Sequence, residues 1–158
     1  MMRNIVLSTT IHACALEELT TQEQALIQEA IRATERSYAP YSNFHVGAAV
    51  RLANGTVVTG CNQENAAFPI TICAERNALF AAANQHPAEP VSMLAIAARN
   101  ANGLLTHPIS PCGSCRQAMI ETEHRYGQTI RILLYGTSVV YVIDGAKALL
   151  PLSFEDLE

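Results

Sequence analysis

Residues 44–61 read FHVGAAVRLANGTVVTGC, and this stretch decides how the chain is expected to fold. Two largely apolar segments, residues 44–52 and 56–61, flank the pair Asn54-Gly55. Asn-Gly between such segments favours a tight turn, because both residues tolerate the positive φ angles that a two-residue hairpin loop requires. The stretch therefore predicts an antiparallel β-hairpin.

The segments on either side of this hairpin alternate between helical and extended patterns. Upstream, Thr20-Thr21-Gln22-Glu23 has the form of a capping box and predicts a helix in a region that Pro40 closes. The other expected elements are strands at 4–12, 91–98, 130–135 and 139–143 and helices at 73–84, 112–126 and 145–150. This alternation predicts a three-layer α/β/α fold, with a mixed central sheet of about five strands covered by helices on both faces.

Two helix starts carry recognisable capping residues. Ser110 and Pro111 suggest a cap and a first helical residue for the helix at 112–126. Thr71 is a plausible cap for the helix that starts near Cys73. Both predicted helix starts are also places where cysteines occur.

Length and charge restrict the classes of function. A chain of 158 residues predicts one domain, residues 1–158. The net charge is −4 and Lys147 is the single lysine, so no basic stripe is present to hold a nucleic acid. No apolar run is long enough to span a bilayer. Small neutral ligands remain as candidate partners.

The N-terminus loosely resembles a secretory signal, with Arg3, a short apolar stretch and Ala13-Cys14-Ala15. Polar residues from Ser8 to Thr10 interrupt the apolar stretch, which disfavours this interpretation. We expect a cytoplasmic protein instead. The chain has five cysteines, and an odd number in a protein of this kind argues against a disulfide framework and leaves thiols free for metal.

The sharpest functional signal joins Cys73-Ala74-Glu75 to Pro111-Cys112-Gly113-Ser114-Cys115. Catalytic zinc usually keeps three protein ligands and one open position for water. Cys112 and Cys115 lie three residues apart, so they share one face of a helical turn. The partial positive charge at a helix start favours the thiolate form that binds zinc.

A structural zinc site is the alternative interpretation, and it requires four ligands. The first half of the motif supplies one cysteine, and Cys14 and Cys61 lack a partner at the usual spacing. Histidines remain available as a fourth ligand, namely His45, His86, His107 and His124. Glu75, an acid two residues from a candidate ligand, favours catalysis.

The combination C-x-E with P-C-x-x-C is the signature of zinc-dependent deaminases. The chain resembles the homotetrameric cytidine deaminases, and the resemblance runs from about Ser37 to Phe154. Residues 1–19 are expected to be an N-terminal extension outside the motif match. The other matching segments are Tyr38-Ala39-Pro40-Tyr41-Ser42, Phe44-His45-Val46-Gly47-Ala48-Ala49, Asn62-Gln63-Glu64-Asn65, Cys73-Ala74-Glu75-Arg76 and Leu149-Leu150-Pro151.

The resemblance implies zinc-dependent hydrolytic deamination of cytidine and deoxycytidine to uridine and deoxyuridine, with release of ammonia, in pyrimidine salvage. It implies one Zn²⁺ per chain, bound by Cys73, Cys112 and Cys115. Zinc lowers the pKa of a bound water. Glu75 is then expected to move protons between the water, N3 of the base and the leaving ammonia. Arg76 is expected to donate a hydrogen bond to thiolate sulfur.

The resemblance also implies the substrate contacts. Phe44 is expected to pack on the pyrimidine ring, and Asn62 and Glu64 to hold ribose hydroxyls. The backbone amide of Ala74 is expected near the base, and Phe154 to border the base of a neighbouring subunit in a homotetramer with shared active sites.

Three other features leave questions open. Phe68 stands where the family often has Tyr, which puts any polar contact by that side chain in question. Cys14 and Cys61 match no functional role. The alanines of residues 73–84 suit either internal packing or a subunit contact.

Two alternatives to a nucleoside deaminase remain at this level. One is a deaminase of a related substrate: a nucleotide, an aminopyrimidine antibiotic or a base in nucleic acid. Asn62 and Glu64 disfavour the antibiotic, and the acidic charge disfavours the nucleotide and the nucleic acid. The other is a zinc-stabilised binding module without catalysis, which Glu75 and the three-ligand count disfavour.

Overall fold

One mixed β-sheet forms the middle layer of the protein in a computed structural model that describes residues 1–155. Its strands are β1 (His12–Cys14), β2 (His45–Leu52), β3 (Val57–Cys61), β4 (Val91–Asn100), β5 (Gly103–Leu104), β6 (Arg131–Tyr135) and β7 (Val140–Asp144). The order across the sheet is β1-β7-β6-β4-β2-β3, with β5 beside β4. Within these residues β4 and β6 form the one parallel pair. The expected mixed sheet is confirmed, and the short strands β1 and β5 add to five longer ones.

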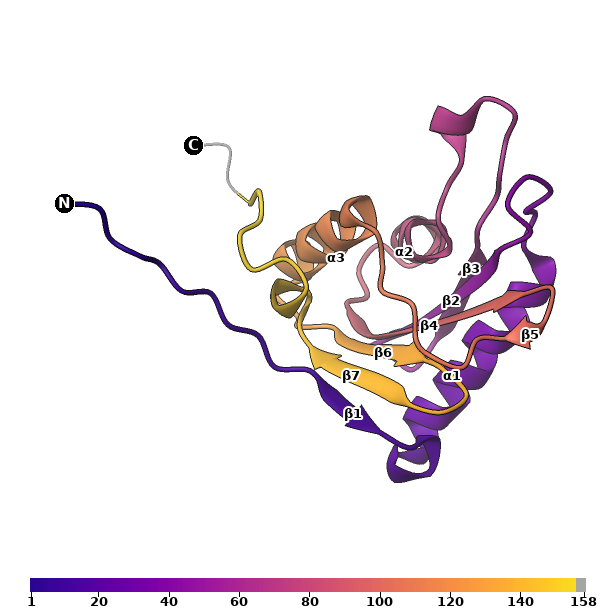
Figure 1. The fold of residues 1–158 in the computed structure, drawn as a ribbon, viewed down its shortest axis with the longest axis horizontal. Helices are drawn as coiled ribbons and strands as arrows, with labels where there is room; N and C mark the ends of the chain where they lie inside the picture. Colours follow the sequence, from indigo (N-terminus) through magenta and orange to yellow (C-terminus); the bar gives the residue numbers. More distant parts are fainter. Residues whose placement is uncertain (156–158) are drawn as a thin grey trace.

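Helices cover both faces of this sheet, as expected (Figure 1). The helices are α1 (Thr21–Ala33), α2 (Ala74–Gln85) and α3 (Gly113–Tyr126). On one face, Leu26 of α1 joins Leu133 of the sheet in a buried cluster. On the other face, Ala78 of α2 and Met119 of α3 share a second cluster with Ile132. Single turns of 3₁₀ helix occur at Leu16–Glu18, Thr34–Arg36, Phe68–Ile70 and Ala146–Ala148.

The predicted hairpin is present as β2 and β3, with Ala48 opposite Gly60. A Cβ atom on Gly60 would lie 2.4 Å from the backbone nitrogen of Ala78 and 2.7 Å from the carbonyl oxygen of Ala74. Only a glycine permits so close an approach of helix to strand. Gly60 therefore sets the height of the first turns of α2 above the sheet.

The predicted capping box is also present. The Thr20 side chain accepts a hydrogen bond from Glu23 N, and the Glu23 carboxylate accepts one from Thr20 N at 2.8 Å. Glu23 is buried and also binds Arg131, which in turn contacts Asp144 at 2.7 Å. The start of α1 is thus tied to β6 and β7.

The strand predicted at residues 4–12 is wrong except for its end. β1 begins at His12, whose partner is Val142. The strand ladder runs out because the chain turns away from the sheet at Gly145, with a φ of 93°, soon after β7 ends. Residues before His12 run outward as an exposed, extended segment (Figure 1), with one hydrogen bond from Thr9 Oγ1 to Ala148 O.

The caps predicted for the two later helices, Thr71 and Ser110, are also wrong. The N-cap of α2 is Cys73, and that of α3 is Cys112, whose carbonyl accepts from Arg116 N at 3.0 Å. The Thr71 hydroxyl instead accepts from Asn65 N, and so it holds the preceding loop. The Pro111 carbonyl accepts from the Arg116 side chain.

The described residues contain no helix with the length and apolarity that a membrane span requires.

Candidate active site and metal centre

Three cysteine sulfurs converge where α2 and α3 begin. Cys73 Sγ lies 3.8 Å from Cys112 Sγ, and Cys112 Sγ lies 3.5 Å from Cys115 Sγ. All three atoms lie within 4.8 Å of one another. Thiolates bound to one tetrahedral zinc at about 2.3 Å would lie roughly 3.8 Å apart, so the arrangement fits a single Zn²⁺. The three predicted ligands are therefore brought together.

The fourth ligand of a structural site is missing from residues 1–155. No histidine, aspartate or glutamate of the described chain joins the three sulfurs as a further ligand. A three-ligand set leaves one coordination position open, which is the arrangement of catalytic zinc rather than of a closed structural site. Among residues 1–155, none of the candidate histidines lies close enough to the three sulfurs to join them.

The three thiols differ in their environment. Hydrogen bonding from Cys115, followed by Arg76 and Cys112, lowers the pKa of Cys73 to about 5. The same hydrogen bond with Cys73, together with burial, raises the pKa of Cys115. Without a metal the cluster thus places its negative charge on Cys73.

Glu75 lies in the first turn of α2, two residues after Cys73. Its residue surface is 4% exposed, and burial raises the pKa of its carboxyl above the ordinary value. A buried carboxyl with a raised pKa can both accept and donate a proton near neutral pH, which general acid–base catalysis requires. Glu75 lines the same pocket as Cys73 and Cys112.

Arg76 contacts the sulfur cluster and is not part of the pocket wall. Its Nη2 donates to Cys73 Sγ at 3.7 Å, and its buried Nε has no hydrogen-bond partner among the described residues. Three thiolates on one Zn²⁺ would carry a net charge of −1. The guanidinium is placed to offset part of that charge.

A pocket of about 450 Å³ opens in front of the cluster. It brings together most of the residues that the sequence singles out, and its walls include Phe44, Asn62, Glu64, Cys73, Ala74, Glu75 and Cys112. Residues that sequence reasoning did not assign to a substrate site complete the wall, namely Val46 of β2 and Ser42, Thr71, Ile72, Ile109 and Ser110 outside the strands and helices. The volume suits a molecule of nucleoside size.

Glu64 is held at the pocket wall by three donors. Its Oε2 accepts from Tyr41 N at 2.8 Å and from Ser42 N at 3.3 Å, and its Oε1 accepts from the Ser42 hydroxyl. The hydrogen bond from the Ser42 side chain, more than any other contact, lowers the pKa of Glu64. The carboxylate is therefore ionised at neutral pH and acts as an acceptor.

The side-chain amide of Asn62 makes most of its hydrogen bonds within the protein. Its Oδ1 accepts from Ser37 Oγ at 2.5 Å and from Val46 N at 2.8 Å, and its Nδ2 donates to Phe44 O at 2.9 Å. One N–H of the amide remains for a ligand. Asn62 thereby also holds the backbone of Phe44, whose side chain packs at the edge of the core.

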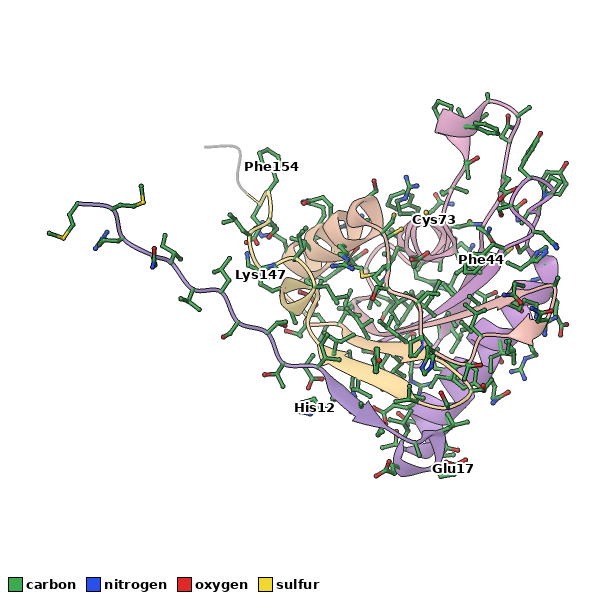
Figure 2. The ribbon with its side chains drawn as sticks, in the orientation of Figure 1. His12, Glu17, Phe44, Cys73, Lys147 and Phe154 are labelled. Atoms are coloured by element: carbon green, nitrogen blue, oxygen red, sulfur yellow. The ribbon has the colours of Figure 1, made fainter. Side chains whose placement is uncertain are left out.

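Phe154 does not reach this pocket in its own chain. Its residue surface is 66% exposed, and Figure 2 shows it well apart from Phe44 and Cys73. Its carbonyl accepts from Gln117 Nε2 at 2.6 Å, so the C-terminal segment lies beside α3. Phe68 is 67% exposed and meets Tyr41 edge to face, with ring centroids 5.6 Å apart.

A comparison with protein families shows that residues 20–128 match the family described as the cytidine and deoxycytidylate deaminase zinc-binding region. The chain belongs to this deaminase family. The match spans both halves of the cysteine cluster and Glu75, and residues 1–19 lie outside it.

Individual members of the deaminase family agree with this assignment. A cytidine deaminase of Halalkalibacterium halodurans is 45% identical over 98 residues, which are 62% of this chain and 70% of that protein. The crystal structure of a Burkholderia pseudomallei cytidine deaminase is similar with a TM-score of 0.72 and 42% identity, over 86% of this chain and all of that one. The Mycobacterium tuberculosis enzyme gives a TM-score of 0.67 at 29% identity, over 87% of this chain and 100% of that chain.

Proposed function

We propose that this protein is a zinc-dependent cytidine deaminase that hydrolyses cytidine to uridine and ammonia. The observation that carries the proposal is the shared pocket: Cys73 and Cys112 of the three-sulfur cluster and the buried acid Glu75 form one wall of a nucleoside-sized cavity. A binding module has no need of a buried acid beside an open metal position.

Zinc, when bound, supplies a Lewis acid that activates a water for attack at C4 of the base. Glu75 accepts a proton from that water and delivers it to N3 of the ring; it then takes the proton of the hydroxyl added at C4 and delivers it to the amino group, which leaves as ammonia. The raised pKa of Glu75, caused by burial, suits a group that must both accept and donate. Arg76 moderates the charge of the thiolates.

The substrate contacts follow from the pocket wall. Phe44 offers its ring to the pyrimidine, and Ala74 offers its backbone amide. Glu64 accepts a hydrogen bond from a ribose hydroxyl, and Asn62 donates its remaining N–H to the ribose. The ordered carboxylate of Glu64 and the partly used amide of Asn62 support this assignment.

Deoxycytidine is the second substrate that we propose, with a role in pyrimidine salvage in the cytoplasm. The ribose contacts come from Glu64 and Asn62, and a substrate with a 3′-hydroxyl alone still offers one group to them. All five cysteines are unpaired, which supports a reducing compartment.

We further propose a homotetramer in which subunits share active sites. The position of Phe154 supports this, because the side chain lies outside its own pocket and is free to border that of a neighbour. A groove of about 690 Å³ between α2 and α3, lined by Leu79, exposed Phe80 and Ala83, offers an apolar surface for a second copy. Ala74, Ala78 and Ala82 are instead buried within the chain.

Purified protein incubated with cytidine tests the activity through the ultraviolet change to uridine. We expect turnover and one zinc per chain by metal analysis. Cys112→Ala should lose zinc and activity together, whereas Cys14→Ala, outside the cluster, should keep both. Absence of turnover in zinc-loaded protein, or full zinc retention in Cys112→Ala, would contradict the proposal.

A further inference from the structure

We propose that Ser42 is a positioning residue for recognition of the sugar: it aims the free acceptor of Glu64 at a ribose hydroxyl and ties that carboxylate to Phe44. The proposal rests on the proposed function, because it assumes that Glu64 meets the sugar. Ser42 itself lines the pocket.

The Ser42 hydroxyl joins two segments of the pocket wall. Its oxygen donates to Glu64 Oε1 and accepts from Phe44 N at 3.1 Å. One side chain thus connects the carboxylate assigned to the sugar with the backbone of the residue assigned to the base. Its backbone N–H adds a hydrogen bond to the other carboxylate oxygen, at 3.3 Å.

A left-handed residue makes this double contact possible. Asn43 has a φ of 53°, a conformation that Asn adopts more readily than most residues. Asn43 N donates to Ala39 O at 3.0 Å, which closes the turn. The turn folds the hydroxyl of Ser42 back onto the amide of Phe44.

The remaining acceptor capacity of Glu64 is confined to one oxygen. An ionised carboxylate offers about four acceptor positions. Two donors occupy Oε2, and Ser42 Oγ occupies one position on Oε1. The free position therefore lies on Oε1, and the hydroxyl of Ser42 decides which way it faces.

The test is kcat/KM of Ser42→Ala for cytidine, 2′-deoxycytidine and 2′,3′-dideoxycytidine. The 3′-hydroxyl is the ribose hydroxyl that both proposed substrates carry, so we take it as the partner of Glu64. We expect a loss of about tenfold for cytidine and 2′-deoxycytidine, mainly in KM, and no more than about twofold for the dideoxy substrate, which lacks that hydroxyl. Ser42→Thr keeps a hydroxyl and should recover most of the loss. A merely structural role would lower all three values alike.

The matched control is Ser138→Ala. Ser138 is exposed, as Ser42 is, but its hydroxyl donates to the backbone carbonyl of Thr106, at 2.7 Å. Ser138→Ala should leave the three ratios unchanged. Equal losses on all three substrates in Ser42→Ala, or no loss on any, would overturn the proposal.

Glu64→Gln separates this proposal from the function on which it rests. It should show the same selective loss as Ser42→Ala. A parent enzyme that deaminates cytidine, combined with a Glu64→Gln variant without selective loss, would overturn the role of Ser42 and leave deamination standing. A parent without deaminase activity would overturn the proposed function itself.

Discussion

Proton transfer by Glu75 can be tested with a single substitution. Glu75→Gln keeps the size of the side chain but removes its ability to carry a proton. We expect kcat to fall by about 100- to 10,000-fold, the range for loss of a general acid–base group. Turnover of cytidine measures the loss, while metal analysis and circular dichroism should show zinc and fold intact. Activity within about tenfold of the parent would show that another group moves the protons.

Arg76 permits a graded test of charge at the metal cluster. Arg76→Ala removes the donor to Cys73 Sγ and leaves the thiolate charge without its partner. We expect about a tenfold loss of kcat/KM or a matching loss of zinc under competition by a chelator, the order of magnitude of one partly exposed charge-assisted hydrogen bond. Arg76→Gln should do less harm because a donor remains. Parent-like behaviour of both variants would reduce Arg76 to a surface residue.

Residue roles differ in how far they can be predicted from the sequence. The clustering of Cys73, Cys112 and Cys115 could be predicted because metal chemistry demands particular atoms at particular spacings. The role proposed for Ser42 could not, although the residue sits inside a matching segment. It depends on the left-handed turn at Asn43, which brings the hydroxyl against two partners and leaves no periodic pattern behind.

At the scale of elements, Glu23 joins the start of α1 to the sheet. Burial alone would raise the pKa of Glu23, but hydrogen bonds from Arg131 and Thr20 outweigh it and lower that pKa. A carboxyl with a lowered folded-state pKa stabilises the fold above its unfolded pKa of about 4.3, and this contribution disappears as the pH falls through the folded value. Glu23→Gln keeps the capping box and removes the charge.

Urea unfolding of zinc-loaded protein checks this linkage. Glu23→Gln should lower the free energy of unfolding by about 1 kcal/mol at pH 7, a value discounted for the partial exposure of Arg131. The difference from the parent should shrink as the pH falls below about 4. Glu29→Gln, which breaks an exposed pair with Arg32, is the control and should cost less than about 0.5 kcal/mol. A constant difference at all pH values would rule out the ionised pair as its source.

Helices and strands that depend on local sequence were predicted well. The wrong predictions concern elements whose ends depend on contacts with residues far away in the sequence. The β2–β3 hairpin and the Thr20–Glu23 capping box depend on residues that are close in sequence, so both can be predicted from the local sequence. The strand expected at 4–12 failed because its partner β7 ends too soon, a fact about residues more than a hundred positions away. The caps expected at Thr71 and Ser110 were wrong, because each helix is capped two residues later, by Cys73 and Cys112, and Thr71 holds the preceding loop instead.

At the scale of the whole molecule, the proposed sharing of active sites between subunits can be tested through Phe154. If Phe154 borders the base of a neighbour, Phe154→Ala should raise KM several-fold without displacing zinc. Activity per chain should also fall when the protein is diluted below its assembly constant. Sedimentation alongside kinetics measures both. A monomer that is fully active at micromolar concentration would refute the shared site and leave the zinc chemistry untouched.

The order of synthesis along the chain determines when the metal cluster can form. Cys73 precedes Cys112 by 39 positions, and β6, which lies between β4 and β7, is made only after α3. At ribosomal rates of about 5–20 residues per second, Cys73 waits roughly two to eight seconds for its partners. During that interval the nascent chain holds Cys73 without the two sulfurs that complete the metal cluster. The metal cluster can therefore assemble only after the start of α3 has been made, when most of the chain already exists.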